Sequence, residues 1–221
     1  MSIPPPDGLE TRHLPDSADS RLFVELSSYQ ADLTEARTAL ELAIAGIDDA
    51  GLLGDARQFL VGYAAVAYCR TYFDSAVRSP MTERIDIPHE HAELHAQITD
   101  YRNKRVAHSQ SHLASTFAFI GIDNDGSIRP GVIGMTAAQE VPASILERWI
   151  SLIDLISELL SELQAEVEAR IIHDVAATDV DEVRAWAMWP TPIDQLDSAF
   201  TARPSRGPYP TTWTNYWGRT N

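Results

Sequence analysis

The chain of 221 residues is poor in cysteine and has no long hydrophobic run. Its single cysteine, Cys69, cannot form an internal disulfide, and nothing in the sequence indicates an oxidising compartment. The longest apolar run, Phe59 to Cys69, is too short to span a bilayer. The first residues lack the basic stretch and apolar stretch of a signal peptide. We therefore expect a cytoplasmic protein without a membrane partner.

Positive charge is also scarce. There are 17 basic residues against 32 acidic ones, which gives a net charge of −15, and Lys104 is the single lysine. An acidic field of this size disfavours non-specific contacts with the phosphates of nucleic acids. RNA chemistry would therefore need a local basic site, and Lys104 lies in the densest basic cluster, from Arg102 to Arg105.

The apolar spacing predicts a mainly α-helical protein, a helical bundle with a small β-hairpin insertion and an irregular aromatic C-terminal tail. The bundle is expected over residues 20–178, after an irregular lead-in at 1–19. The Trp- and Pro-rich tail at 179–221 is expected to pack on the bundle or on a partner subunit. The predicted helices are 20–49, a second with Asp55 as N-cap to about Val77, a third from Pro88 through His108, and a long fourth from Pro142 to about Ile172.

A β-hairpin is predicted at about residues 115–135. The turn sequence Asp123-Asn124-Asp125-Gly126 lies there between two short apolar runs. The same four residues could begin a calcium-binding loop, but the glutamate that such a loop needs downstream is missing.

Arg70 interrupts an apolar face of the second predicted helix. That face carries Phe59, Tyr63, Val66, Phe73 and Val77. A buried guanidinium is costly unless it is paired. Two interpretations stay open. Arg70 forms a core salt bridge with an acidic residue of another helix, or it points into a cleft and holds a phosphate or carboxylate.

The third predicted helix has a stripe that begins apolar and ends polar. It consists of Leu94, Ile98, Tyr101, Arg105, His108 and His112. A helix with this stripe packs at one end and lines a cleft or an interface at the other. A single histidine there could simply be a satisfied structural residue, whereas the basic cluster around it favours a functional site.

The segment Arg102-Asn103, followed after four residues by His108, resembles the R-x4-6-H motif of HEPN domains. Arg84 and Arg105 also precede histidines at suitable spacings, but only Arg102 is followed by a polar residue within an uninterrupted helical pattern. HEPN proteins are helical bundles that commonly dimerise. Many are metal-independent ribonucleases of toxin–antitoxin and phage-defence systems.

The resemblance implies an endoribonuclease that needs no metal or other cofactor. Arg102, Asn103 and His108 would be catalytic, and the product would end in a 2′,3′-cyclic phosphate. Lys104 and Arg105 would hold the RNA backbone, with Arg70 as an additional phosphate ligand. The expected partners are RNA, a second copy of the chain and an antitoxin.

Helix geometry also favours a homodimer. Residues six apart on a straight helix point roughly 120° apart. Arg102 and His108 therefore do not converge within one helix, whereas a two-fold axis would bring two copies of the motif together.

Two other functions remain open. His91 and His95 are spaced i, i+4, as are His108 and His112, so either pair could bind one metal ion. Alternatively, the chain is a non-catalytic interaction or nucleotide-binding protein, for which an acidic surface and an aromatic tail are suited.

Overall fold

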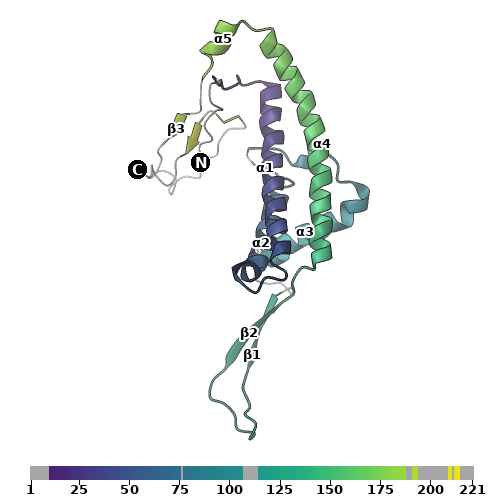
Figure 1. Ribbon diagram of the computed structural model, residues 1–221, viewed down its shortest axis with the longest axis vertical. Coiled ribbons are helices and arrows are strands. Elements are labelled where there is room, and N and C mark those ends of the chain that lie inside the picture. The colour runs from purple at the N-terminus through teal and green to yellow at the C-terminus, as the bar shows by residue number, and fades with distance from the viewer. Residues whose placement is uncertain are drawn as a thin grey trace. The chain divides into compact units, whose positions relative to one another are not determined.

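The structure is a computed structural model that describes residues 10–75, 77–106, 114–187, 191–193, 209–210 and 212–214. The chain is mainly helical, with a small antiparallel hairpin between the third and fourth helices, as the sequence predicted (Figure 1). No helix in the described ranges is long and apolar enough to cross a membrane. The helical elements are α1 (Ala18–Ala45), α2 (Leu52–Arg70), η1 (Met81–Glu83), η2 (His89–His91), α3 (Ala92–Tyr101), η3 (Arg102–Val106), α4 (Ala143–Ala176) and α5 (Val180–Ala185).

The strands form two separate pairs, an antiparallel one of β1 (Ala114–Phe119) and β2 (Ile133–Ala138) and a parallel one of β3 (Thr191–Ile193) and β4 (Thr212–Thr214). The chain divides into two compact units, and α1 and α4 contribute to both. The first unit comprises Met1–Gln30, Asp74–Pro80 and Leu159–Asn221, and the second comprises Ala31–Phe73 and Met81–Glu158.

The second unit has its core around Trp149. This side chain is almost fully buried and meets the buried ring of Tyr68 edge-on, with 5.8 Å between ring centroids. Each large apolar side chain buried in this way contributes about 1.5–3 kcal/mol relative to an exposed one. The helices α1, α3 and α4 supply further buried residues, among them Leu33, Leu40, Leu94, Ile98, Leu146, Leu152, Ile153 and Ile156.

The boundaries of α2 differ from the prediction at both ends. The carboxylate of Asp49 accepts hydrogen bonds from the backbone N–H groups of Gly51 and Leu53, so the helix begins before Asp55. Asp55 is therefore not the N-cap but a first-turn residue, where its negative charge still suits the helix dipole. The helix ends at Arg70 rather than near Val77. The Thr71 hydroxyl and backbone N–H both donate to the Tyr68 carbonyl there, which tightens the last turn.

The sequence analysis placed the apolar face with Phe59 and Tyr63 in the protein core, whereas the structure has it largely on the surface. Phe59 is 71 % exposed, and Tyr63 and Phe73 are exposed as well. The helix instead buries a face made largely of small residues, which allow the backbones of neighbouring helices to approach closely. The buried residues of α2 are Val61, Ala64, Ala65, Ala67, Tyr68 and Cys69. Phe59 and Tyr63 remain on the surface of the second unit.

The β1–β2 hairpin forms as predicted. Phe117 lies opposite Met135, and Phe119 lies opposite Ile133. In the connection, the Gly126 N–H donates to the Asp123 carbonyl at 2.9 Å. Gly126 has φ +84°, a conformation that glycine adopts without steric cost.

In the first unit, the start of α1 lies beside the end of α4, where the Arg170 guanidinium pairs with the Asp19 carboxylate at 2.8 Å. The described part of the tail contacts the lead-in segment of the same chain. The Tyr209 hydroxyl donates to the Leu14 carbonyl at 2.6 Å, and the His13 N–H donates to the Ala187 carbonyl at 2.7 Å.

Candidate functional site

The motif segment lies on a widened helical turn. The α-helix α3 ends at Tyr101 and continues directly into η3, a π-helical turn over Arg102–Val106. A turn with i→i+5 hydrogen bonds is rare in proteins and occurs frequently at functional sites. Arg102, Asn103, Lys104 and Arg105 all lie on it. His108 lies outside the described residues, as does His112.

Arg102 is held by neutral groups. Its Nη1 donates to Oδ1 of the adjacent Asn103 at 2.9 Å, and its guanidinium lies over the Phe73 ring, 5.0 Å from the centroid. Both Arg102 and Asn103 are half-buried. Within the described ranges, no carboxylate is within ion-pair distance of Arg102. Its positive charge is therefore oriented by the amide and the ring without being neutralised.

The two neighbouring cations differ in their partners. Lys104 is exposed, and its Nζ pairs with Oδ2 of Asp100, one helical turn earlier, at 2.6 Å. Arg105 is half-buried, and none of the described acidic residues pairs with it. In a chain of net charge −15, most described arginines have a carboxylate partner. Arg102 and Arg105 are therefore the residues of the basic cluster best placed to attract an anion.

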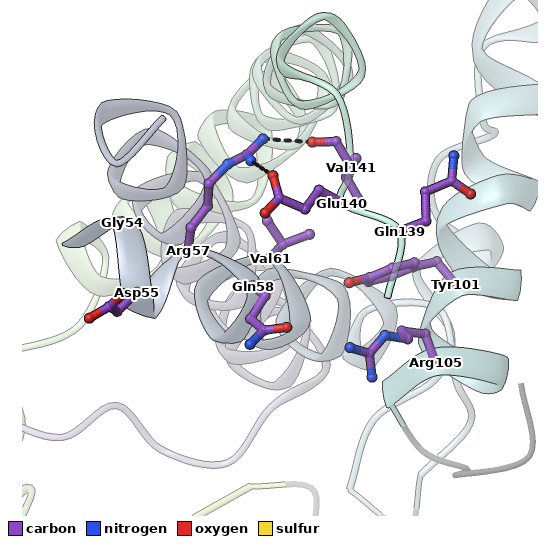
Figure 2. Close-up of a pocket in the computed structure, with 10 residues that line it drawn as sticks. All are labelled: Gly54, Asp55, Arg57, Gln58, Val61, Tyr101, Arg105, Gln139, Glu140 and Val141. Carbon is purple, nitrogen blue, oxygen red and sulfur yellow. Dashed lines mark hydrogen bonds and ion pairs between the residues drawn. The ribbon is translucent and has the colours of Figure 1, made fainter. Parts of the chain in front are cut away.

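A hollow of about 270 Å³ lies beside Arg105, between α2 and the α3–η3 helix (Figure 2). Arg105 and Tyr101 extend into it from one side, and Gln58 of α2 faces them from the other. At the far end, Arg57 pairs with Glu140, and its Nη2 donates to the Val141 carbonyl at 2.8 Å. The Arg57 charge is thus neutralised, whereas the Arg105 charge faces the hollow.

A second hollow of about 290 Å³ shares Gln58, Tyr101 and Arg105 with the first. Its other wall is largely apolar and consists of Phe59, Gly62, Tyr63, Val66 and Val106. Together the two hollows form a groove, which we call the Arg105 groove. It offers a cationic group and amide donors beside exposed aromatic rings, a combination that suits the phosphates and bases of single-stranded RNA.

Arg70 lies elsewhere on α2 and is balanced by carboxylates of α1. Its Nη2 pairs with Oδ1 of Asp32 at 2.7 Å and with Glu35. The Tyr63 hydroxyl donates to Glu35 at 2.6 Å, and this hydrogen bond and Arg70 together lower the pKa of Glu35 below its usual value. Of the two interpretations of Arg70, an ion pair with another helix describes these contacts. The expectation that Arg70 is buried was wrong, because the face that carries it is exposed.

The histidines of α3 do not form a metal site within the described residues, where no three His, Cys, Asp or Glu side chains converge. Nδ1 of His95 lies 3.0 Å from the Tyr68 hydroxyl, and its ring packs edge-on against Tyr72. Burial lowers the pKa of His95 below its usual value. His91 ends η2, before α3. The alternative pair of His108 and His112 lies outside the described residues.

Sequence reasoning missed Phe73 and Gln58 as neighbours of the motif. Both come from the α2 region, about thirty to forty-five residues earlier in the chain, and neither belongs to a recognisable pattern with Arg102.

Comparison of the chain with protein-family models, with curated proteins and with solved structures finds no match.

Proposed function

We propose that the chain is a HEPN-like, metal-independent endoribonuclease. The observation that supports this most directly is the π-helical turn with two half-buried arginines, Arg102 and Arg105, that have no carboxylate partner among the described residues. An arginine without a carboxylate partner keeps its full charge available to stabilise the charge that develops on a phosphate. A role as a toxin or defence component, with an antitoxin as partner, extends this proposal.

In the proposed reaction, the 2′-hydroxyl of RNA attacks the adjacent phosphorus. The bond between O2′ and phosphorus forms, and the bond from phosphorus to O5′ breaks. His108 takes the proton from the 2′-hydroxyl or supplies one to the departing O5′, since a histidine titrates near neutral pH. One product ends in a 2′,3′-cyclic phosphate and the other in a 5′-hydroxyl, with no net change in protons.

Arg102 stabilises the negative charge on the phosphorus-bound oxygens in the transition state. The Phe73 ring and Asn103 hold its guanidinium, so little reorganisation is needed when the RNA binds. Arg105 and Lys104 contact the RNA backbone, and the contribution of Arg105 is larger because Lys104 is exposed and already paired with Asp100. Arg70 contributes less than either, because two carboxylates accompany it.

A second copy of the chain completes the site in this proposal. The resemblance to HEPN domains, which commonly dimerise, favours a composite site in which each copy of the motif faces the other. RNA and a second subunit are therefore the two partners of the proposed activity.

Cleavage of a mixed-sequence RNA in the presence of EDTA tests the proposal. The wild-type protein should cleave, and Arg102→Ala should reduce the rate by about 100-fold or more, the usual cost of losing a donor to a developing oxyanion. His108→Ala should be at least as damaging. Arg184→Ala is the matched control, because this arginine of α5 is exposed, lies outside the motif and, among the described residues, pairs with Asp181.

Each outcome of this experiment separates the three functions. Cleavage that EDTA abolishes would favour the metal site of the histidine pairs. Absence of cleavage in all conditions would favour a non-catalytic interaction protein, which the exposed apolar hairpin described below also suits. Equal activity of Arg102→Ala and wild type would refute the motif as the active site.

A further inference from the structure

The β1–β2 hairpin exposes more large apolar side chains than any other described element. Every residue from Ser115 to Phe119 and from Ile133 to Ala137 is exposed or half-buried. The large apolar side chains of the hairpin and its connection are between 47 % and 72 % exposed. They are Phe117, Phe119, Ile120, Ile122, Ile128, Val132, Ile133 and Met135.

The register collects the largest of these on one side of the ribbon. Residues directly opposite one another share a face, so Phe117 with Met135 and Phe119 with Ile133 form one continuous apolar surface. The other face carries small or polar side chains at the same level, and the hydroxyls of Thr116 and Thr136 lie 2.8 Å apart there. A two-stranded hairpin alone in water is at best marginally stable, and packing against another surface stabilises it.

The body of the hairpin carries no charge. Residues 114–122 and 130–138 contain no Asp, Glu, Lys or Arg in a chain of net charge −15. The charged residues of the hairpin are confined to the tip, where Arg129 pairs with Asp123 at 2.6 Å. A second acidic copy of the chain could therefore contact this segment without bringing acidic side chains against one another.

The exposed area of both faces of the hairpin together reaches what a dimer requires. With side chains of roughly 150–200 Å² each, the eight exposed portions amount to roughly 800 Å², the area that one partner buries in a stable interface, and Phe117, Phe119, Ile133 and Met135 supply somewhat under half of it from one face. We propose that the hairpin is a dimerisation arm, covered by the hairpin of a second copy of this chain. The contact is isologous, so the same apolar residues from both copies face each other across a two-fold axis.

This inference does not depend on RNA cleavage. It assigns the self-association of the chain to a surface outside the motif, and a protein without nuclease activity would form the same dimer. The pairing of one apolar ribbon with another also explains why the exposed residues are large and uncharged along the body, whereas the tip is polar.

Sedimentation equilibrium of the full-length protein at micromolar concentration tests the arm. The wild type should be a dimer. Phe117→Asp and Ile133→Asp each place a charge in the apolar contact and should raise the dimer dissociation constant at least tenfold. Leu42→Asp is the matched control, because Leu42 on α1 is as exposed as Phe119 and adds the same charge away from the hairpin.

A charge-rescue experiment guards against misfolding. Phe117→Asp and Phe117→Lys should each be largely monomeric with unchanged helical circular dichroism, and an equimolar mixture should form a dimer again. A monomeric wild type, whether the hairpin binds another protein or none, would overturn the proposal. So would dimers that survive both Asp substitutions, a Leu42→Asp variant that dissociates as readily, or a mixture that fails to re-associate.

Discussion

The hydrogen bond between Tyr68 and His95 links α2 to α3, the helix that continues into the motif turn. The Tyr68 side chain is fully buried, and its hydroxyl lies 3.0 Å from Nδ1 of His95. Tyr68→Phe keeps the ring packing on Trp149 but removes this bond and leaves a half-buried imidazole nitrogen without its partner. We expect the free energy of unfolding to fall by about 1–3 kcal/mol.

Tyr72 provides a matched comparison at the same place. Its ring packs on the same imidazole, with 4.5 Å between centroids, but its buried hydroxyl has no hydrogen-bond partner among the described residues. Tyr72→Phe should therefore leave the stability unchanged or raise it slightly. Urea unfolding followed by circular dichroism at 222 nm measures both variants. Equal losses, or a larger loss for Tyr72→Phe, would refute the assignment of the hydrogen bond.

Three further predictions concern burial. Burial lowers the pKa of His95, so at mildly acidic pH the unfolded chain binds a proton that the folded chain does not. The free energy of unfolding should therefore fall as the pH drops below about 6.5. In urea unfolding, His95→Gln should reduce this dependence on pH. Trp149→Ala should cost about 3–5 kcal/mol in the same assay, whereas Phe59→Ala should cost under about 1 kcal/mol, since Phe59 is mostly exposed. Burial raises the pKa of Cys69 to about 11, so its thiol should resist alkylation at pH 8 in the folded protein and react rapidly in denaturant.

The sequence predicted elements whose signals are local. The turn residues from Asp123 to Gly126 identified the hairpin, because Asp-Gly between two apolar runs favours a tight turn, and Gly126 has the positive φ that glycine adopts readily there. The long helix was also predicted closely, since Trp149, Leu152 and Ile156 repeat at helical spacing and all three are buried.

The orientation of α2 could not be predicted from its own residues. Its two faces are both apolar, one with Phe59 and Tyr63 and the other with Ala64 and Ala65, and spacing alone favours the larger side chains as the core. Which face is buried depends on how closely the neighbouring helices approach, and that is decided by residues outside α2. The wrong expectation that Arg70 is buried follows from the same misassignment of the two faces.

The candidate site was located from sequence only in part. Arg102 and Asn103 were chosen as candidate site residues because they begin a motif that can be recognised along the chain. The π-helical turn and the contact with Phe73 could not be anticipated, because the first depends on how α3 ends and the second joins distant segments. The Arg105 groove is likewise a product of the packing of α2 against α3.

We propose that RNA is cleaved by its own 2′-hydroxyl and that Arg102 stabilises the transition state. The most direct measurement is mass spectrometry of the products of a short RNA in EDTA, compared with the same RNA in which the cleaved nucleotide carries a 2′-deoxy sugar. We expect a fragment that ends in a 2′,3′-cyclic phosphate, no cleavage at the 2′-deoxy position, and little product with Arg102→Ala. Cleavage of the 2′-deoxy substrate at that position, or fragments that end in a 5′-phosphate, would contradict it.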